Sequence, residues 1–307
     1  MNTQQHKAKA MDASLKINDS MTTFYFSFFR YRRTMFKIKP LVFCLTLLLA
    51  ACGGSSGFAP FISAAKPEFL QYGRTATILL GGRHLRSFLV VESPGCANPV
   101  FSQRSTTELL VLNCMVNGVG DLPLSVKDPE GKLVFATTLT VPKPQVNLVT
   151  SAGNMLLELD PAKAPVSVNN FLSYVRQGFY TNTLFHRVIS GFVVQGGGYN
   201  TGLVKKPGQA APIALESQNG LSNLRGTLAM ARTNEPNSAT SEFYVNLVDN
   251  LFLDYRDSAN PGYAVFGTVV QGMGVVDAIA SQPTGTVNGV PNVPLSEVTI
   301  TSAVQVR

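Results

Sequence analysis

Residues 185–198 read Phe-His-Arg-Val-Ile-Ser-Gly-Phe-Val-Val-Gln-Gly-Gly-Gly. Residues with high β propensity dominate this run, and three glycines close it. The pattern predicts a strand, a tight turn, a second strand and then a loop with a permissive backbone. It places Arg187 beside an apolar surface, although a single arginine on a strand is more often solvated or ion-paired than catalytic.

Further motifs stand on both sides of this stretch. Residues 145–150 and 154–160 alternate apolar and polar side chains about a short Ser-Ala-Gly segment, which predicts a hairpin. Residues 165–178 have apolar side chains at helical spacing, and Gly178 is suited to end that helix. The downstream motifs are residues 223–232 (NLRGTLAMAR), 239–246 (ATSEFYVN), 252–254 (FLD), 263–267 (YAVFG) and a second predicted helix over about residues 272–280.

Taken in order, these motifs resemble those of the cyclophilin family of peptidyl-prolyl isomerases. The resemblance covers residues 145 to about 305 and includes residues 164–171 (APVSVNNF), which are similar to the first helix of cyclophilins. It implies a mainly β protein in which residues 145–307 form a closed eight-stranded β-barrel capped by two helices. The implied activity is rotation about X–Pro bonds, which requires no covalent chemistry and no cofactor.

The resemblance also implies a set of site residues. Arg187 is expected to be the catalytic cation, because a guanidinium stays charged and is directional, and Gln195 is expected to hold that arginine or the substrate carbonyl. The remaining implied substrate-binding residues are Phe192, Val193, Ala231, Arg232, Glu242, Tyr244, Phe252, Leu253 and Tyr263. Each aromatic residue could instead belong to the barrel core, and we expect this of Phe243 because it should point away from the face of Tyr244.

Four of these positions depart from the commonest eukaryotic pattern. Val193 replaces a methionine, Glu242 a glutamine, Phe252 a tryptophan and Tyr263 a histidine. Phe252 and Tyr263 also resemble bacterial members of the family. Glu242 differs in kind, because an acid near Arg187 could offset its charge and weaken catalysis.

Two functions are therefore compatible with the sequence. One is a lipid-anchored isomerase acting on proline-containing peptides in exported or unfolded proteins, and the other is a lipid-anchored module that binds such peptides with little or no turnover. The joint presence of Arg187, Phe192 and Gln195 favours the enzyme, whereas Glu242 favours the binding module. The sequence offers no metal-ligand cluster, nucleophile motif or phosphate loop, so neither a metal nor a cofactor is expected.

Residues 1–51 are predicted to be a leader. Its apolar run of eleven residues, 41–51, is too short at about 1.5 Å per residue to span a bilayer core of about 30 Å, and it follows a basic flank. Leu49-Ala50-Ala51-Cys52 resembles the bacterial lipobox, which predicts cleavage before Cys52, lipid on its thiol and a tether over residues 52–59. The alternative is an ordinary cleavage site with Cys52 as a bystander. Residues 1–34 fit no part of the signal, so Met35 is a candidate for the true start.

This leader predicts export to the periplasmic face of a bacterial membrane, and the glycine after Cys52 resembles lipoproteins of the outer membrane. It also explains most of the formal net charge of +7. Eight basic and two acidic residues precede Cys52, so removing the leader leaves +1. A nearly neutral mature protein lacks the electrostatic footprint of nucleic-acid binding. With 45% hydrophobic and 14% charged residues over 307, the chain suits two globular domains.

Residues 60–141 are predicted to form a small immunoglobulin-like β-sandwich, separated from residues 145–307 by a stiff Pro-Lys-Pro junction. The exported context favours a disulfide between Cys96 and Cys114, with two buried free thiols as the alternative. A spacer, a docking surface and a sugar-binding module all remain open for this region. The predicted strands are residues 75–80, 87–91, 108–112, 122–127 and 133–141.

Overall fold

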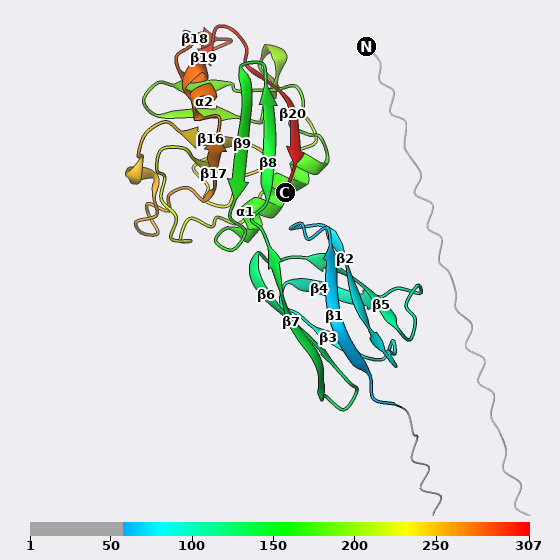
Figure 1. The fold of residues 1–307 in the computed structure, drawn as a ribbon. Helices are drawn as coiled ribbons and strands as arrows, with labels where there is room; N and C mark the ends of the chain where they lie inside the picture. Colours follow the sequence, from blue (N-terminus) through cyan, green and yellow to red (C-terminus); the bar gives the residue numbers. More distant parts are fainter. Residues whose placement is uncertain (1–57) are drawn as a thin grey trace, which may run out of the picture. The chain divides into compact units, whose positions relative to one another are not determined.

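The computed structural model of the protein describes residues 58–307, and these form a mainly β structure with two α-helices (Figure 1). The predicted leader, the lipidated Cys52 and the candidate start at Met35 lie outside the described residues. Within residues 58–307, no helix combines the length and the apolar character that crossing a bilayer would require. The domain boundaries stay predictions.

Seven strands precede residue 142 and form two antiparallel sheets, in the orders β1-β2-β5-β4 and β3-β6-β7. Ile78 and Leu112 of the first sheet and Val126 of the second belong to one buried cluster, so the two sheets pack face to face. The immunoglobulin-like assignment stays a prediction. The strands are β1 Phe61–Glu68, β2 Thr75–Arg83, β3 Val90–Glu92, β4 Cys96–Phe101, β5 Leu109–Val116, β6 Gly120–Lys127 and β7 Leu133–Val141.

Sequence reasoning missed two of these strands, β1 and β4. In β1 only Ile62 is buried, so the apolar alternation of a half-buried strand is absent. In β4 the register shifts between Ala97 and Val100, and this bulge contains Asn98 with a positive φ of 52° followed by Pro99. Turn-forming residues inside a strand read as a loop, which is why β4 was not expected.

Cys96 on β4 and Cys114 on the neighbouring β5 are joined by a disulfide, with their Cα atoms 5.3 Å apart. Both side chains lie in the core between the two sheets, at 4% and 3% exposure. The bond therefore links two adjacent strands from the buried side.

The strands after residue 144 form a large antiparallel sheet in the order β11-β12-β16-β15-β17-β9-β8-β20-β10-β13-β14 (Figure 1). The predicted mainly β fold with two helices is confirmed. Instead of eight strands in a closed ladder, the described residues form a curled half-barrel of eleven, in which β11 and β14 are the two ends. Three of the additional strands are only two residues long, which is too short for a sequence pattern.

The elements of this region are β8 Gln145–Thr150, β9 Gly153–Leu159, α1 Pro165–Arg176, β10 Thr183–Leu184, β11 Arg187–Ile189, β12 Val193–Gly196, β13 Tyr199–Asn200, η1 Thr201–Leu203, β14 Val204–Lys205, β15 Thr227–Met230, β16 Phe243–Asn246, η2 Leu251–Leu253, β17 Val265–Gln271, α2 Met273–Ala280, β18 Thr284–Val287, β19 Val290–Pro294 and β20 Thr299–Gln305. Here η denotes a short 3₁₀ helix, and β18 and β19 pair only with each other.

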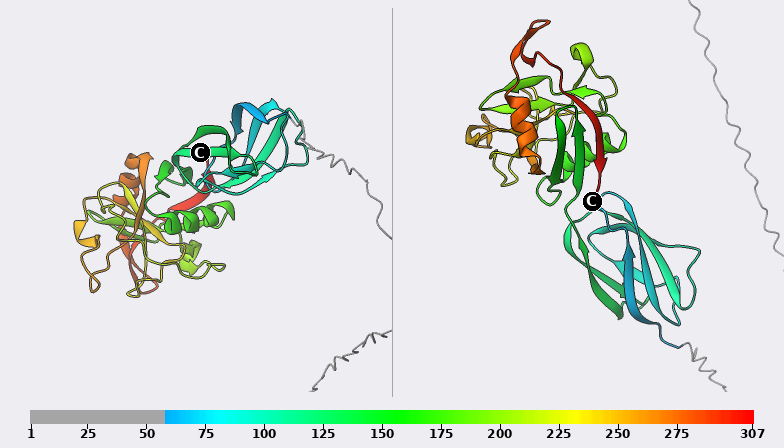
Figure 2. Two further views of the ribbon diagram at one scale, coloured as in Figure 1. Left: turned by 90° about the horizontal axis from the view of Figure 1, so that it is seen from below. Right: turned by 45° about the horizontal axis from the view of Figure 1, so that its top comes forward.

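Helix α1 begins with Pro165 in its first turn, where the missing N–H costs nothing, and Gly178 follows it in the left-handed region at φ 64°. No side chain of its own caps the helix. Instead, the backbone N–H groups of Val166 and Ser167 donate to the carboxylate of Glu216 at 2.9 and 2.7 Å. A carboxylate at this end also complements the helix dipole. Helix α1 lies against β17 and β20 and α2 against β9, β11 and β12, so the helices cover different parts of the sheet (Figures 1 and 2).

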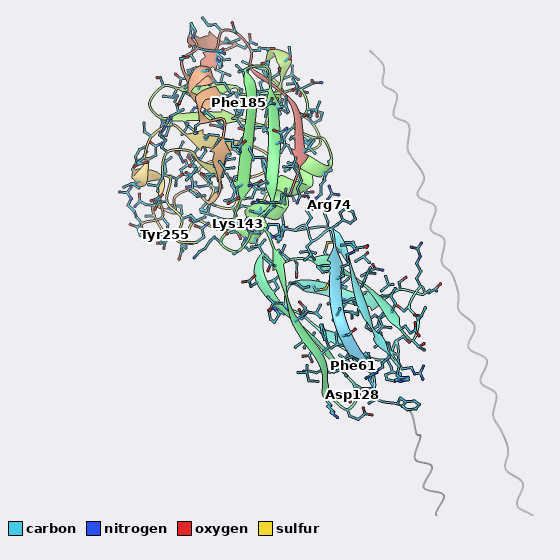
Figure 3. The ribbon with its side chains drawn as sticks, in the orientation of Figure 1. Phe61, Arg74, Asp128, Lys143, Phe185 and Tyr255 are labelled. Atoms are coloured by element: carbon cyan, nitrogen blue, oxygen red, sulfur yellow. A yellow bond between two sulfur atoms is a disulfide. The ribbon has the colours of Figure 1, made fainter. Side chains whose placement is uncertain are left out.

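The core beneath α1 is rich in aromatic residues. Phe185, labelled in Figure 3, is one of its buried members. The ring of Phe171 lies 5.1 Å from that of Tyr180, 5.4 Å from Phe243 and 5.3 Å from Phe266, measured between centroids. Offset and edge-on arrangements at this spacing stabilise a core beyond simple burial. Phe243 is fully buried here, as expected from its alternation with Tyr244.

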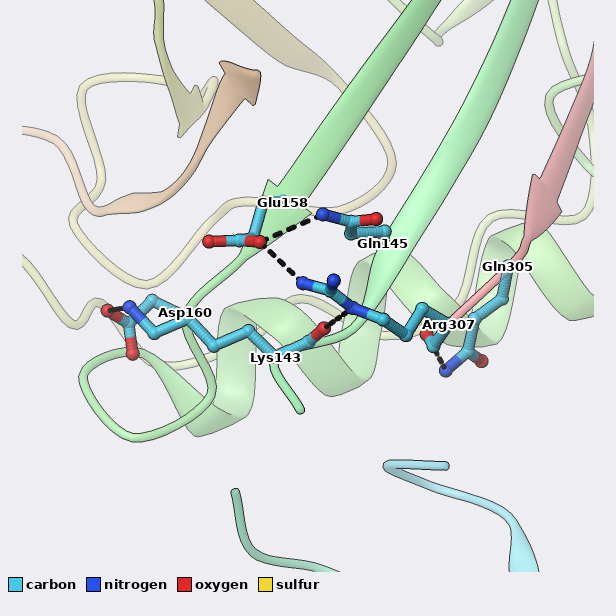
Figure 4. A network of polar contacts seen from close by, with 6 residues as sticks. All are labelled: Lys143, Gln145, Glu158, Asp160, Gln305 and Arg307. Carbon is cyan, nitrogen blue, oxygen red and sulfur yellow. Dashed lines mark hydrogen bonds and ion pairs between the residues drawn. The ribbon is translucent and has the colours of Figure 1, made fainter. Parts of the chain in front are cut away.

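Polar contacts tie the last strand to the first hairpin (Figure 4). Arg307 donates to the carboxylate of Glu158 at 2.7 Å, and Gln145 donates to the same oxygen at 2.9 Å. Lys143 pairs with Asp160 at 2.7 Å. These groups are partly exposed, so each pair contributes at most about 1 kcal/mol. Their role is to hold β8, β9 and the chain end in register around the half-barrel.

Candidate active site

One cavity of about 490 Å³ lies on the half-barrel. Its lining consists of Arg187, Phe192, Val193, Gln195, Ala231, Arg232, Tyr244, Leu253 and Tyr263. The structure therefore brings together the implied site residues apart from Glu242 and Phe252, which do not line the cavity. The cavity combines apolar side chains with a few polar ones, as ligand pockets commonly do.

Strand register explains why these residues meet. Arg187 on β11 is paired with Gln195 on β12, Gln195 with Tyr244 on β16, and Tyr244 with Ala229 on β15. Residues directly opposite one another in an antiparallel pair point to the same face. The intervening residues, such as Val194 and Val245, point into the barrel core instead. One face of four neighbouring strands thus builds the cavity and the other fills the fold.

The apolar part of the cavity forms a buried cluster of its own, which includes Val193 and Tyr244 and has the partly buried Leu253 packed against it. Phe192 belongs to its margin, and its ring stacks on that of Phe252 at 5.7 Å and 19°. Phe252 itself is 61% exposed. Phe252 therefore lies beside Phe192 without lining the cavity, and its implied place at the rim of the substrate site stays a prediction.

Arg187 is held by a neutral partner. Its Nη1 donates to Oε1 of Gln195 at 3.2 Å, whereas no carboxylate of the described residues lies within 4 Å of its guanidinium. A guanidinium fixed by an amide keeps its full charge and its remaining N–H groups for a substrate.

Glu242 does not pair with Arg187, contrary to the expectation from the sequence. Its Oε2 lies 3.3 Å from Nε2 of His186 and accepts a hydrogen bond of 2.9 Å from Nε2 of Gln195. Burial raises the pKa of Glu242, but hydrogen bonding and charge from His186, the Gln195 bond and the charge of Lys205 outweigh it, so the net pKa lies below its usual value. The carboxylate is therefore ionised at neutral pH and engaged away from the cavity.

A buried amide network supports the floor and was not recognised from the sequence. The hydroxyl of Tyr244 donates to Oδ1 of Asn223 at 2.8 Å, and Asn246 donates to the same oxygen at 3.2 Å. Asp254 in turn accepts from Asn223 at 2.8 Å. Burial and the nearby Tyr263 and Asp254 raise the pKa of Tyr244 well above its usual value, so its hydroxyl stays protonated and remains a donor. The sequence carried a signal only for Asn246, which ends the apolar strand β16, whereas Asn223 lies in a loop before β15.

Arg232 shapes the opposite rim. Its guanidinium lies 4.5 Å from the ring centroid of Tyr263 and donates to the carbonyls of Gly262 and Thr233 at 3.0 and 2.8 Å. A cation over an aromatic ring holds both groups in place. The rim is thereby fixed before any peptide arrives.

In residues 58–307 no three His, Cys, Asp or Glu side chains are grouped as metal ligands would be. What the cavity offers is an apolar surface that can hold a proline ring, next to a positioned guanidinium. That arrangement can favour a twisted amide over a planar one by hydrogen bonding and charge.

Comparison with known proteins agrees with this geometry. Residues 145–305 match the family described as "Cyclophilin type peptidyl-prolyl cis-trans isomerase/CLD". The chain is 52% identical over 171 residues to peptidyl-prolyl cis-trans isomerase A of Dickeya dadantii, covering 55% of this chain and 86% of that protein. It is 48% identical over 159 residues to peptidyl-prolyl cis-trans isomerase B of Escherichia coli, covering 51% and 96%. Because the family match spans more than half of the chain, this protein belongs to the cyclophilin-type peptidyl-prolyl cis-trans isomerases.

Proposed function

We propose that this isomerase accelerates X–Pro rotation by electrostatic stabilisation centred on Arg187, without covalent chemistry. The uncatalysed barrier is about 18–20 kcal/mol, because rotation breaks the resonance of the amide. In the twisted state the imide nitrogen is pyramidal and its lone pair can accept a hydrogen bond. An N–H of Arg187 is a suitable donor, and its interaction with the planar ground state is weaker.

The apolar residues of the cavity would bind the proline ring of the substrate. A proline ring packed against Phe192, Val193 and Leu253 loses water and is held while the peptide bond turns. Ala231 and Arg232 line the same cavity, and their backbone groups other than the N–H of Ala231, which is bonded to the carbonyl of Glu242, would meet the flanking peptide. Ground-state binding and transition-state stabilisation would thus come from different parts of the site.

The observation that carries this proposal is the hydrogen bond that Arg187 donates to Gln195 at the partly apolar cavity. It also weakens the alternative of a proline-binding module with little turnover. That alternative depended on Glu242 offsetting the charge of Arg187, and Glu242 is paired with His186 instead.

The test is an isomerisation assay on the mature protein with short X–Pro peptides. The rate is monitored by exchange NMR or with a protease that cleaves only the trans form. Rates well above the uncatalysed reaction are expected. Peptide binding without acceleration would support the binding-module alternative.

The substrates we propose are unfolded or extended exported proteins, reached from a lipid anchor on Cys52. The support is the lipobox-like segment at residues 49–52 and the following Gly-Gly-Ser-Ser tether. A lipoprotein carries more than one acyl chain, which gives stable membrane attachment where a single chain does not. We propose that the lipid anchor lies in the outer membrane.

Replacing the lipid-bearing cysteine gives a direct prediction. Cys52→Ser should abolish membrane association, because no thiol remains for the lipid, and the activity of the folded protein should be unchanged. Fractionation of cells expressing wild type or variant, with metabolic labelling by a fatty acid, measures this. Wild-type protein recovered unlabelled in the soluble fraction would contradict the anchor.

A further inference from the structure

Four side chains form a continuous line of polar contacts from a buried histidine to the cavity. His186, 6% exposed, lies 3.3 Å from Oε2 of Glu242. The same oxygen accepts from Nε2 of Gln195 at 2.9 Å, and Oε1 of Gln195 accepts from Arg187 at 3.2 Å. The last member is the proposed catalytic cation.

The charge of Glu242 decides how the amide of Gln195 must lie. A carboxylate only accepts hydrogen bonds, so the NH₂ group of Gln195 has to face it and the amide oxygen has to face Arg187. A neutral glutamine at position 242 could either donate or accept. A glutamine at position 242 would therefore permit both orientations of the Gln195 amide. In one of them the NH₂ group of Gln195 faces the guanidinium of Arg187, so that two donors meet without an acceptor.

The Glu242 carboxylate is held in the position that this orientation of the Gln195 amide requires. Its side chain is 22% exposed, and it packs so closely on the third glycine of the run that a Cβ on Gly198 would lie 2.5 Å from its carboxyl carbon. The ring of His186 also contacts that of Tyr199, with 4.5 Å between centroids and a tilt of 50°. Nδ1 of His186 is buried without a hydrogen-bond partner among the described residues, so the pair with Glu242 is the polar contact that orients this ring.

We propose that Glu242 is a positioning residue: it fixes the orientation of the Gln195 amide and through it aims the guanidinium of Arg187 at the substrate. This inference rests on the proposed role of Arg187. It reverses the expectation that the acid weakens catalysis, because the carboxylate acts on a neutral amide and leaves the guanidinium unpaired.

Two variants disturb the carboxylate in different ways. Glu242→Ala removes it, and Gly198→Ala keeps it but displaces it, since the added methyl group would overlap the carboxyl group. For each we expect kcat to fall about tenfold, as for the loss of one oriented hydrogen bond, while KM for an X–Pro peptide changes little. Glu242→Gln should lose only part of this rate, because its amide oxygen can still accept from Gln195 but its NH₂ group also permits the other orientation.

A double-mutant cycle shows whether the effect passes through Gln195. Glu242→Ala should cost almost nothing in a Gln195→Ala background if the acid acts only by orienting that amide. An equal loss in both backgrounds, or a lower thermal unfolding midpoint that accounts for the rate, would overturn the inference in favour of a structural role. A rise in kcat for Glu242→Ala would overturn it in favour of charge offset.

The same measurements separate this inference from the proposed function. If Arg187→Ala retains wild-type activity, the Arg187 mechanism itself fails. If Arg187→Ala is slow but Glu242→Ala and Gly198→Ala are as fast as wild type, the mechanism stands and only the positioning role of Glu242 is wrong.

Discussion

Arg187→Ala is expected to lower kcat/KM for an X–Pro peptide about a hundredfold, which corresponds to about 2.7 kcal/mol of transition-state stabilisation. The guanidinium would interact most strongly with the twisted bond, so its removal should leave peptide affinity nearly unchanged. Affinity is expected to come instead from the apolar residues around Phe192 and Leu253. Arg187→Lys should recover only part of the rate, because an ammonium keeps the charge but not the planar fork.

A matched control is available in Arg256, which belongs to the same half-barrel, is exposed and does not line the cavity. Arg256→Ala should retain wild-type kcat/KM. The measurement is exchange NMR at several peptide concentrations, which separates kcat from KM, with titration of a proline peptide for affinity. Equal losses for both arginine variants would point to a general effect of charge, and no loss for Arg187→Ala would contradict the proposed mechanism.

The cavity face was accessible from the sequence because strand alternation is a local property. Once residues 187–189 and 193–196 are assigned as paired strands, Arg187 and Gln195 must share a face. The family resemblance suggested Tyr244 as a site residue, and alternation from it predicted Phe243 in the core, where the structure has it buried. The long helix α1 was equally clear, since its apolar residues recur at helical spacing over three turns.

The partner of Glu242 could not be obtained in this way. Glu242 lies 56 positions after His186, and their contact depends on how β16 is aligned with β12 and on the close approach of Gly198. Such choices are made by tertiary packing. The sequence placed an acid near an arginine, whereas the fold interposes the Gln195 amide and supplies a buried histidine as the partner.

Edge strands and short ladders were missed for a related reason. Strands β13 and β14 have two residues each, and their pairing is set by the curvature of the sheet that they extend. The helix cap at Glu216, 49 residues from Ser167, is likewise a long-range contact with no local signature. The local sequence pattern identifies long helices and strands. The positions of the two-residue strands depend on tertiary packing, which the local pattern does not contain.

Loss of the disulfide should destabilise the two-sheet region at residues 61–141 by about 3 kcal/mol, the chain-entropy value for closing a loop of 18 residues. Because the whole stability of a domain is only about 5–15 kcal/mol, this is a large share. The variant Cys96→Ser with Cys114→Ser also places two hydroxyls in the core between the sheets, which adds to the cost unless they find partners.

Hydrogen exchange under increasing denaturant, read separately for peptides of residues 61–141 and 145–307, would localise the loss. We expect the protection of β4 and β5 to fall at lower denaturant in the variant, and kcat/KM at low temperature to be unchanged, because the cavity residues all lie on the half-barrel. Wild type reduced with a thiol reagent is the matched control, because it breaks the same disulfide without changing a residue. The loss of stability that it shares with the variant is due to the missing bond. Any further loss in the variant is due to the buried serines. If neither treatment shifts the exchange of β4 and β5, the pairing of these strands is stable without the covalent link.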